Sequence, residues 1–395
     1  MQAEPAVRVG DVLELAVTAV AHGGSCVARH EGQVVFVRHA LPGERVRARV
    51  TQVRSKFLRA DCVEVLAASA DRVEAPCPYA GVCGGCDWQH AALPAQRALK
   101  AAVVEEQLQR LAGIELEVPV EEVPGAPDGL DWRTRVAYAV DADGRAGFHA
   151  YHSHDVVPVD RCAIAHPAVR ELGIETKRWP GERRITVAAA PTGGGSVVQP
   201  GGAKAQRRSV REHAAGRTWQ VTGTGFWQVH PGAPDTLVDA VLDGLQPQPG
   251  ESALDLYAGV GLFAGALAER LGPGGWVTAV ESGRDAVGDA RANLADLPTV
   301  DMRQGDVLHV LRGLRLRRAD LVVLDPPRRG AGREVVDLLC RLQTRRTAYV
   351  TCDPAALARD VRYFRDHAWQ LRGVRAFDLF PMTHHVECVA ILEPA

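Results

Sequence analysis

The chain has 395 residues, enough for two or three domains, and its 46% hydrophobic and 24% charged residues are typical of an ordinary soluble protein. No apolar run approaches the length of a membrane span, and residues 1–5 lack the basic patch and apolar core of a signal peptide, so we expect a cytoplasmic protein with no membrane partner. A net charge of −2 gives no global sign of a nucleic-acid partner, and nine cysteines in a reducing compartment indicate metal binding or catalysis rather than disulfides.

Residues 1–66 are predicted to form a small β-barrel, because short alternating strands follow one another between glycine and proline turns. Val12–Val20 alternates apolar and polar residues until His22-Gly23-Gly24 interrupts the pattern. A later strand carries three basic side chains on one face of the sheet: Arg45, Arg47 and Arg49. Two interpretations stay open, a solvated edge strand protected by charge or a face that binds an RNA backbone.

Three cysteines lie within ten residues, at Cys77, Cys83 and Cys86, among glycines that let the backbone curl around a ligand. This spacing is a strong signal for metal binding. A tetrahedral site needs a fourth ligand, and the candidates are Cys62, His90, Cys162 and, with less support, Cys26. Thiolate ligands suit either zinc or an iron–sulfur cluster, and the spacing does not separate the two, although zinc is the commoner structural use.

Residues 67–231 are expected to form a central domain. Apolar residues near a 3.6-residue spacing predict a helix over residues 96–111. Several β-type runs follow between residues 112 and 225, which predicts that the rest of this domain is rich in strands.

Residues 232–395 alternate between strand and helix patterns, which predicts a parallel, doubly wound sheet. The predicted strands include residues 253–256, 276–281, 320–325 and 348–351. Ligands of such folds bind beyond the carboxyl ends of the strands. Four acids are expected at or near those ends: Asp255, Glu281, Asp306 and Asp325.

The first of these strands runs into a glycine-rich turn with Tyr257, Gly259 and Gly261, and an Ala/Leu-rich helix follows. A strand, a Gly-x-Gly turn and a helix can hold NAD or S-adenosylmethionine. The acids favour the methyl donor, because Glu281 is placed to accept both ribose hydroxyls and Asp306 could reach an adenine amine. Asp325 is followed by two prolines that fix the backbone at the edge of the site.

A candidate nucleophile, Cys352, stands between a short apolar strand and a helix that Asp353 is expected to cap. The partial positive charge at the helix N-terminus is expected to favour its thiolate. The final strand, predicted over Phe380–Leu392, is interrupted by Glu387, a candidate base if it is buried. Taken singly, an inert buried cysteine and a surface glutamate would be the better interpretations.

Together a thiolate, a carboxylate base and a methyl-donor site suit methylation of uracil. Carbon 5 of uracil is too poor a nucleophile to take a methyl group directly. Addition of a thiolate to carbon 6 places electron density on carbon 5, and after methyl transfer a base must remove the carbon 5 proton so that the cysteine can leave.

Five motifs in this order resemble those of the RNA 5-methyluridine (uracil-C5) methyltransferases, and the match runs from the N-terminal barrel to the last strand. The motifs are Phe226-Trp-Gln228-Val-His230, Asp255-Leu-Tyr-Ala-Gly-Val-Gly261, Asp325-Pro-Pro-Arg328-Arg-Gly330, Val350-Thr-Cys352-Asp-Pro354 and His384-His-Val-Glu387-Cys388. Residues 24–44 also resemble a TRAM domain, an OB-like RNA-binding module. The chain is most similar to the 23S rRNA enzymes that carry a TRAM domain and a [4Fe–4S] cluster.

This resemblance implies a multidomain α/β fold: an OB-like TRAM barrel (1–66), a central domain that binds the cluster and contacts RNA (67–231) and a class I, Rossmann-like methyltransferase domain (232–395). It implies Cys352 as nucleophile and Glu387 as base. The implied donor and uracil pockets contain Gln228, Tyr257, Gly259, Gly261, Glu281, Asp306 and Asp325. The implied cluster ligands are Cys77, Cys83, Cys86 and Cys162.

The resulting hypothesis is a cytoplasmic, monomeric enzyme that uses S-adenosylmethionine to methylate uridine C5 in RNA, with 23S rRNA favoured and tRNA possible. The alternatives are a tRNA uridine-C5 enzyme, an RNA cytosine-C5 enzyme and a catalytically idle Fe–S RNA-binding protein. Three positions depart from the commonest family pattern: Ala258, where cysteine is frequent, and His230 and Asp353, where asparagine is frequent.

Overall fold

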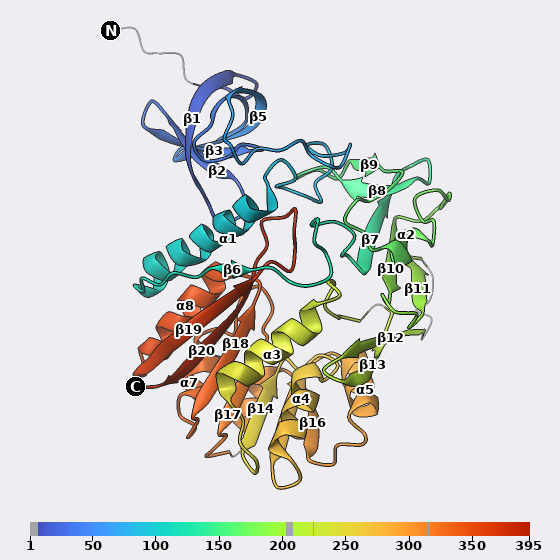
Figure 1. The fold of residues 1–395 in the computed structure, drawn as a ribbon, viewed down its shortest axis with the longest axis vertical. Helices are drawn as coiled ribbons and strands as arrows, with labels where there is room; N and C mark the ends of the chain where they lie inside the picture. Colours follow the sequence, from blue (N-terminus) through green and yellow to red (C-terminus); the bar gives the residue numbers. More distant parts are fainter. Residues whose placement is uncertain (1–6, 203–207, 224, 315) are drawn as a thin grey trace.

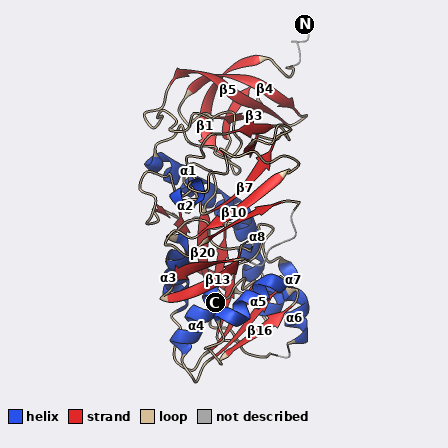
Figure 2. Cartoon of the chain, turned by 90° about the vertical axis from the view of Figure 1, so that its right-hand side faces the viewer, coloured by secondary structure: helices blue, strands red, loops and turns tan. Residues whose placement is uncertain are grey.

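The computed structural model describes residues 7–202, 208–223, 225–314 and 316–395. A barrel, a central β-rich region and an α/β domain follow one another along the long axis (Figure 1). In the turned view the barrel is again at one end and the helices of the α/β domain lie towards the other (Figure 2). No helix within the described ranges is both long and apolar enough to cross a membrane. Residues 1–5, on which the expectation of no signal peptide rests, lie outside the described residues.

The N-terminal part is a closed five-stranded barrel, as predicted, with the strand order β1-β2-β3-β5-β4. Its strands are β1 (Val12–Val20), β2 (Cys26–His30), β3 (Gln33–Arg38), β4 (Arg45–Val53) and β5 (Phe57–Ala67). Alternate residues of β1, such as Leu13 and Leu15, are buried inside the barrel. The three arginines of β4 all point outwards, and two of them pair with Glu14 and Glu64 on the neighbouring strands.

The central region contains a five-stranded sheet with the order β11-β10-β7-β8-β9 and a separate β12-β13 hairpin. These elements are β7 (Arg135–Val140), β8 (Ala146–His149), β9 (Val156–Pro158), α2 (Pro167–Arg170), β10 (Arg184–Ala189), β11 (Ser196–Pro200), β12 (Ser209–Ala214) and β13 (Arg217–Thr222). All pairings in both sheets are antiparallel. The predicted β-rich character of this region is therefore confirmed.

The C-terminal part is built on an eight-stranded sheet with the order β16-β15-β14-β17-β18-β20-β19-β6. Its strands are β6 (Val120–Glu121), β14 (Ser252–Leu256), β15 (Trp276–Glu281), β16 (Val300–Gln304), β17 (Leu321–Leu324), β18 (Arg346–Thr351), β19 (Trp369–Phe377) and β20 (Glu387–Pro394). The first five strands of that order are parallel, as expected, but β20 runs antiparallel to both β18 and β19. The sheet is therefore mixed, because β19 and β20 follow one another as an antiparallel pair rather than through a crossover helix.

Helices cover both faces of this sheet. They are α3 (Ala233–Leu245), α4 (Leu262–Leu271), α5 (Arg284–Asn293), α6 (Val307–Gly313), α7 (Arg333–Leu339) and α8 (Pro354–Arg365). One hydrophobic cluster joins α3 and α4 to alternate strand residues such as Val323 and Val350. A second cluster joins α6, α7 and α8 to the intervening strand residues such as Val322 and Tyr349. Because successive strand side chains point to opposite faces of the sheet, a hydrophobic core forms on each face, and the domain has three layers.

The helix predicted over residues 96–111 is observed as α1 (Leu93–Gln107), which continues into a π-helical turn, η1 (Leu108–Ala112). Gly113 follows in a left-handed conformation and ends it. Val104 and Leu108 pack in the second core of the C-terminal sheet. Lys100, which is completely buried, pairs with Asp378 at 2.5 Å, so α1 is bound to the chain that leads into β20.

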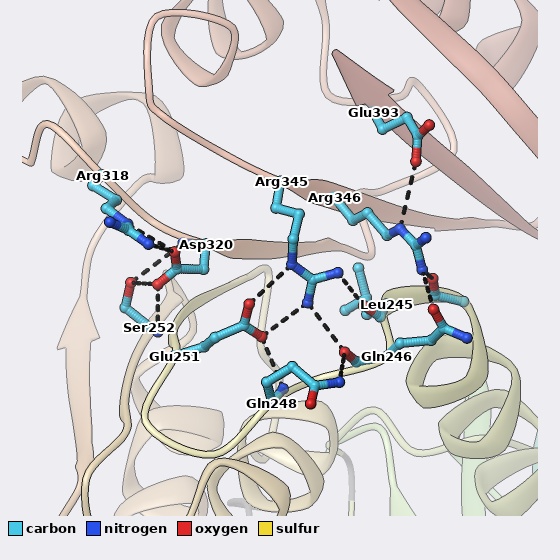
Figure 3. A network of polar contacts seen from close by, with 11 residues as sticks. Leu245, Gln246, Gln248, Glu251, Ser252, Arg318, Asp320, Arg345, Arg346 and Glu393 are labelled. Carbon is cyan, nitrogen blue, oxygen red and sulfur yellow. Dashed lines mark hydrogen bonds and ion pairs between the residues drawn. The ribbon is translucent and has the colours of Figure 1, made fainter. Parts of the chain in front are cut away.

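A polar network crosses the edge of the sheet where β14, β17 and β18 begin (Figure 3). Arg345 donates two hydrogen bonds of 2.9 Å to the carboxylate of Glu251. Asp320 accepts from the backbone and hydroxyl of Ser252 and from Arg318. The carboxylates of Glu251 and Asp320 each accept several hydrogen bonds, so they fix the register of the strands at this end of the sheet. This end is opposite the predicted site.

Elements from two of the predicted domains share one core, since α1 and β6 precede residue 232 and yet pack with the C-terminal sheet. The boundaries predicted at residues 66 and 231 stay predictions.

Candidate active site

The register of two strands places the predicted nucleophile and base side by side. In the β18–β20 pair, Thr351 stands opposite Cys388. The next residue after Thr351 is Cys352 and the residue before Cys388 is Glu387, so these two occupy adjacent positions at the same end of the sheet. Cys352 is followed by Asp353, whose carboxylate caps α8 by accepting a 2.8 Å hydrogen bond from the Ala356 amide.

The Cys352 thiol is held in its protonated form. Burial, followed by the nearby carboxyl of Glu387, raises its pKa to about 11, and the guanidinium of Arg328 opposes this shift. The sequence predicted the opposite, a thiolate favoured by the N-terminus of α8. That prediction is wrong for this state of the protein, because removal from water and the surrounding carboxyl groups outweigh the helix terminus.

Glu387 is 5% exposed and is the first residue of β20. The predicted strand was too long, because the chain from Phe380 to Val386 is a loop in which Met382 adopts a left-handed conformation. Burial, together with Asp325, raises the pKa of Glu387 well above its usual range, and Arg328 opposes it. The carboxyl group therefore holds a proton at a pH at which an exposed glutamate would be ionised.

Asp325 follows β17 and completes a group of acids around the reactive pair. Burial raises its pKa to about 7. Arg328, three residues later, lies close enough to lower the pKa of both Cys352 and Glu387. Its guanidinium is 3.4 Å from the His385 ring nitrogen. Arg328 belongs to the motif Asp325–Gly330, which by itself predicted no role for it.

Cys352 lines a cavity whose wall comes from distant parts of the chain. Its lining residues are His22, Gly23, Gly24, Val103, Arg328, Cys352, Asp353, Pro354, His384, His385 and Val386. The barrel, α1, the loop after β17, the start of α8 and the segment before β20 all contribute. Glu387 and the predicted donor-binding residues are not among these described lining residues.

The barrel contributes the turn His22–Gly24 to this wall. His22 Nε2 is 3.6 Å from the Asp353 carboxylate, and Asp353 raises the pKa of His22. A Cβ at Gly24 would stand 2.7 Å from the His384 side chain, so only glycine fits there. The Gly24 carbonyl also accepts a 2.9 Å hydrogen bond from the Trp88 indole. The sequence predicted this turn as a break between strands, and Gly24 as part of the TRAM resemblance, but it gave no sign of contact with Asp353 or His384; the adjacent glycines were the available signal.

The segment before β20 is held in place from the other side. His384 Nδ1 lies 2.6 Å from the Asp87 carboxylate, which follows directly after Cys86. Burial, followed by His384 and Arg328, lowers the pKa of His385 to about 3, so its ring stays neutral. The segment leading to Glu387 is therefore connected to the cysteine-rich loop as well as to the barrel.

The predicted donor turn lies between β14 and α4. Tyr257, Gly259 and Gly261 all adopt positive φ angles, of 67°, 55° and 93°. Gly261 cannot be replaced without strain, because a Cβ there would lie 2.6 Å from Leu294. Asp255 stabilises the turn by accepting a 2.8 Å hydrogen bond from the Ala264 amide, and burial raises its pKa to about 7.

The other predicted donor residues follow the neighbouring strands. Glu281, at the end of β15, accepts hydrogen bonds from the amides of Gly259 and Gly283, which joins it to the glycine turn. Asp306 caps α6 through one carboxylate oxygen. Because β16, β15, β14 and β17 are consecutive in the sheet, Asp306, Glu281, the turn and Asp325 lie along one edge.

Gln228 is buried in the segment between β13 and α3, and the adjacent Trp227 packs in the hydrophobic cluster that includes Ala258 and Val260 of the donor turn. His230, one of the unusual positions, is also buried. It stacks against Trp132 with the ring centroids 6.1 Å apart, and burial lowers its pKa to about 4.

A second cavity lies in the central region and is lined by the predicted cluster ligands Cys77, Cys83, Cys86 and Cys162. Of the four candidates for a fourth ligand, Cys162 lines this cavity, whereas Cys26, Cys62 and His90 are not among its lining residues. Burial raises the pKa of Cys86 to about 12 and that of Cys162 to about 11, so a bound metal would have to supply the charge that ionises them. Within the described residues, no group of three or more His, Cys, Asp or Glu side chains is arranged so that it could hold a metal ion. The four thiols therefore line one cavity without forming a ready metal site.

Comparison with known proteins is consistent with this arrangement. Residues 6–63 match the family described as TRAM domain, and residues 218–395 match the family described as tRNA (Uracil-5-)-methyltransferase. A Streptomyces avermitilis protein described as an uncharacterized RNA methyltransferase is 53% identical, with 98% of this chain and 99% of that protein covered. A Bifidobacterium longum protein of the same description is 36% identical, with 96% of each covered.

The chain belongs to the RNA uracil-C5 methyltransferase family. It is an RNA methyltransferase that uses S-adenosylmethionine and carries an N-terminal TRAM barrel, as the motifs predicted. The crystal structure of Pyrococcus abyssi tRNA (uracil-54, C5)-methyltransferase in complex with S-adenosyl-L-homocysteine is 23% identical and has a TM-score of 0.72, covering 96% of this chain and 99% of that one. That similarity establishes a shared fold.

Proposed function

We propose that this RNA methyltransferase methylates carbon 5 of a uridine through a covalent bond between the Cys352 sulfur and carbon 6, with Glu387 as the base. The observation that carries the proposal is the β18–β20 register, which sets these two residues in adjacent positions beside Asp325 and Arg328. Cys352 also lines a cavity, so a substrate base has space to approach its sulfur.

The proposed reaction passes through a covalent adduct. The Cys352 thiol gives up its proton to solvent, the sulfur attacks carbon 6 and the ring becomes an enolate. Carbon 5 then takes the methyl group of S-adenosylmethionine, and S-adenosylhomocysteine leaves. Glu387 removes the carbon 5 proton, the sulfur–carbon bond breaks and the cysteine regains its electron pair. A carboxyl with a raised pKa is a stronger base once it is ionised, which suits removal of a proton from carbon.

The proposed donor site is the edge formed by the glycine turn and the acids beside it. Glu281 would accept the ribose hydroxyls chiefly through Oε2, which accepts one hydrogen bond from Gly259, whereas Oε1 already accepts from Gly283 and Ser282. Asp306 would accept from the adenine amine through the oxygen that does not cap α6. Gln228, Tyr257, Gly259, Gly261 and Asp325 complete the proposed donor and uracil pockets. Binding of labelled S-adenosylmethionine by Glu281→Gln, compared with the unaltered protein, tests the ribose contact.

The proposed substrate is RNA whose target uridine is turned out of its stack into the cavity beside Cys352. Ribosomal 23S RNA is favoured because the chain combines a TRAM barrel with a cysteine cluster. A tRNA substrate is the main alternative, since the structural neighbour from Pyrococcus abyssi is described as a tRNA enzyme. Mapping 5-methyluridine in the rRNA and tRNA of a strain that lacks the gene distinguishes the two.

We also propose that the four cysteines of the central cavity hold a [4Fe–4S] cluster. The support is that all four line one cavity, together with the family resemblance of their spacing. When bound, such a cluster would stiffen the loop that carries Asp87 and hence the segment before β20. A structural role is favoured over a redox role, because methyl transfer moves no net electrons.

The decisive experiment uses RNA in which 5-fluorouridine replaces uridine. Fluorine at carbon 5 cannot be removed as a proton, so the methylated adduct should remain attached to Cys352 and survive denaturing electrophoresis. Cys352→Ala should form no adduct, and Cys340→Ala, a thiol outside the cavity, serves as the matched control. Methylation by Cys352→Ala at the normal rate would overturn the covalent mechanism and favour an idle RNA-binding protein.

An RNA cytosine-C5 methyltransferase uses the same covalent chemistry. The cytosine alternative predicts an adduct with 5-fluorocytidine RNA and 5-methylcytidine as product. Digestion of the methylated RNA to nucleosides and their separation by chromatography identifies the product base.

A further inference from the structure

A basic groove begins at the mouth of the Cys352 cavity and has no role in the proposed chemistry. It is lined by His22, Leu111, Arg328, Arg333, Asp353, Ala355, Ala356, Arg359, Arg362, Tyr363 and Asp366. Three of these residues, His22, Arg328 and Asp353, also line the cavity, so the groove and the cavity are continuous. Four arginines and two carboxylates give the groove an excess of positive charge.

Helix α8 places the basic residues in a line. Ala355, Arg359, Arg362 and Asp366 follow one another at spacings of four, three and four residues, which puts them on one side of the helix. At 1.5 Å per residue, Arg362 stands roughly 13 Å along the axis from Asp353. The line therefore leads away from the cavity along the surface.

The carboxylates of the groove are already neutralised. Asp353 lies beside His22 and caps α8, and Asp366 accepts a 2.8 Å hydrogen bond from Arg333. Arg362 is exposed and, among the described residues, makes no ion pair and no hydrogen bond through its guanidinium. Among the described residues, Arg328 contacts only the neutral ring of His385 within hydrogen-bond distance. The charges of Arg328 and Arg362 are thus free to meet an anion, and Arg333, whose charge Asp366 offsets, keeps guanidinium N–H groups that do not bond Asp366.

The groove also offers a flat surface. The Arg333 guanidinium lies over the Tyr363 ring at 4.3 Å from its centroid, and Tyr363 is partly exposed. A guanidinium group binds phosphate through its parallel N–H groups. Unpaired bases stack on aromatic rings and on guanidinium planes, and Tyr363 and Arg333 provide both.

We propose that this groove holds the single-stranded RNA that flanks the target uridine, with Arg333 and Arg362 on its phosphates. The proposal rests on the proposed function, since a uridine seated beside Cys352 must have its neighbouring nucleotides at the mouth of the cavity. An RNA strand that leaves this mouth along α8 meets Arg328 first, then Arg359 and Arg333, and finally Arg362.

The test measures binding of a fluorescein-labelled 12-nucleotide oligouridylate by anisotropy between 50 and 300 mM KCl. The double variant Arg333→Glu/Arg362→Glu should bind at least about tenfold more weakly at 100 mM salt. The slope of log K against log salt should fall by about one to two, as expected for the loss of two phosphate contacts. The matched control is Arg270→Glu/Arg291→Glu, which makes the same charge change on exposed residues of α4 and α5 that do not line the groove.

Both double variants should bind labelled S-adenosylmethionine as the unaltered protein does, which establishes that they are folded. Oligouridylate binding equal to that of the control variant would overturn the groove proposal. This readout is independent of catalysis. If the unaltered enzyme forms no adduct with 5-fluorouridine RNA, the covalent mechanism fails, while a selective loss of binding in the groove variant still establishes the RNA path.

Discussion

Thr351 and Cys388 face each other across β18 and β20, and this pairing brings Cys352 and Glu387, the proposed nucleophile and base, to the same end of the sheet. Because β20 is antiparallel, the residue that follows Thr351 and the residue that precedes Cys388 come to the same end of the sheet. A shift of the register by one residue would turn the Glu387 side chain to the other face and away from the thiol. The base and the nucleophile therefore depend on the same backbone hydrogen bonds.

Replacement of Glu387 by Gln should separate bond formation from release. The amide keeps the shape of the side chain but cannot take the carbon 5 proton, so the methylated uridine should stay bonded to Cys352. Ordinary uridine RNA should then give a covalent complex on a denaturing gel, with turnover reduced by two or more orders of magnitude. Free 5-methyluridine RNA released at the normal rate would show that another group is the base.

The same substitution should change how stability depends on pH. Burial raises the pKa of Glu387 in the folded protein, so its favourable contribution is present at low pH and is lost as the pH rises through the folded-state value. Glu387→Gln should therefore gain stability relative to the unaltered protein between pH 5 and pH 9. Urea unfolding across this range measures the difference, and a constant difference would contradict the shift.

The rate of covalent bond formation should rise with pH. With the pKa of the Cys352 thiol near 11, the thiolate is a minor form at neutral pH and its fraction grows about tenfold per pH unit. Adduct formation with 5-fluorouridine RNA should follow this increase between pH 6.5 and 8.5. Arg328→Gln removes the charge that lowers this pKa, so it should be slower at each pH. A pH-independent rate in both proteins would indicate that the thiol is deprotonated by the bound substrate.

The buried pair between Lys100 and Asp378 should be essential for stability. Removing one partner leaves a buried charge without compensation, which typically costs about 3–5 kcal/mol. Lys100→Met should lose about this much in urea unfolding. The double variant Lys100→Met/Asp378→Leu should recover part of the loss, because both charges are then absent. Equal stability of the unaltered protein and Lys100→Met would show that the pair contributes little.

Iron content tests the proposed cluster. Protein purified without oxygen should be brown and should hold about four irons per chain, with absorption in the blue part of the visible spectrum. Cys86→Ser should lose the iron, whereas Cys62→Ser, a barrel cysteine outside the cavity, should retain it. Zinc in stoichiometric amount without iron would rule out the cluster.

Much of the fold follows from local pattern. The strict alternation of β1 and β4 predicts the barrel, and the strand-turn-helix runs of the last third predict the layered sheet, because burial of one face requires a period of two in a strand and near 3.6 in a helix. Site residues such as Cys352 and Glu281 were also recognisable, since strand ends in such a sheet converge on one edge.

What only the tertiary structure decided concerns pairs that are distant in the sequence. The chain alone did not indicate that β20 is antiparallel and begins at Glu387, or that His22 of the barrel reaches Asp353. Residue spacing also left Cys162 as one of several candidate partners of the other three cysteines, and only the family resemblance favoured it. The sequence also suggested the wrong charge state for Cys352. Local pattern reports which residues prefer to be buried, whereas a pKa, a strand register and a shared cavity depend on which neighbours arrive from elsewhere in the chain.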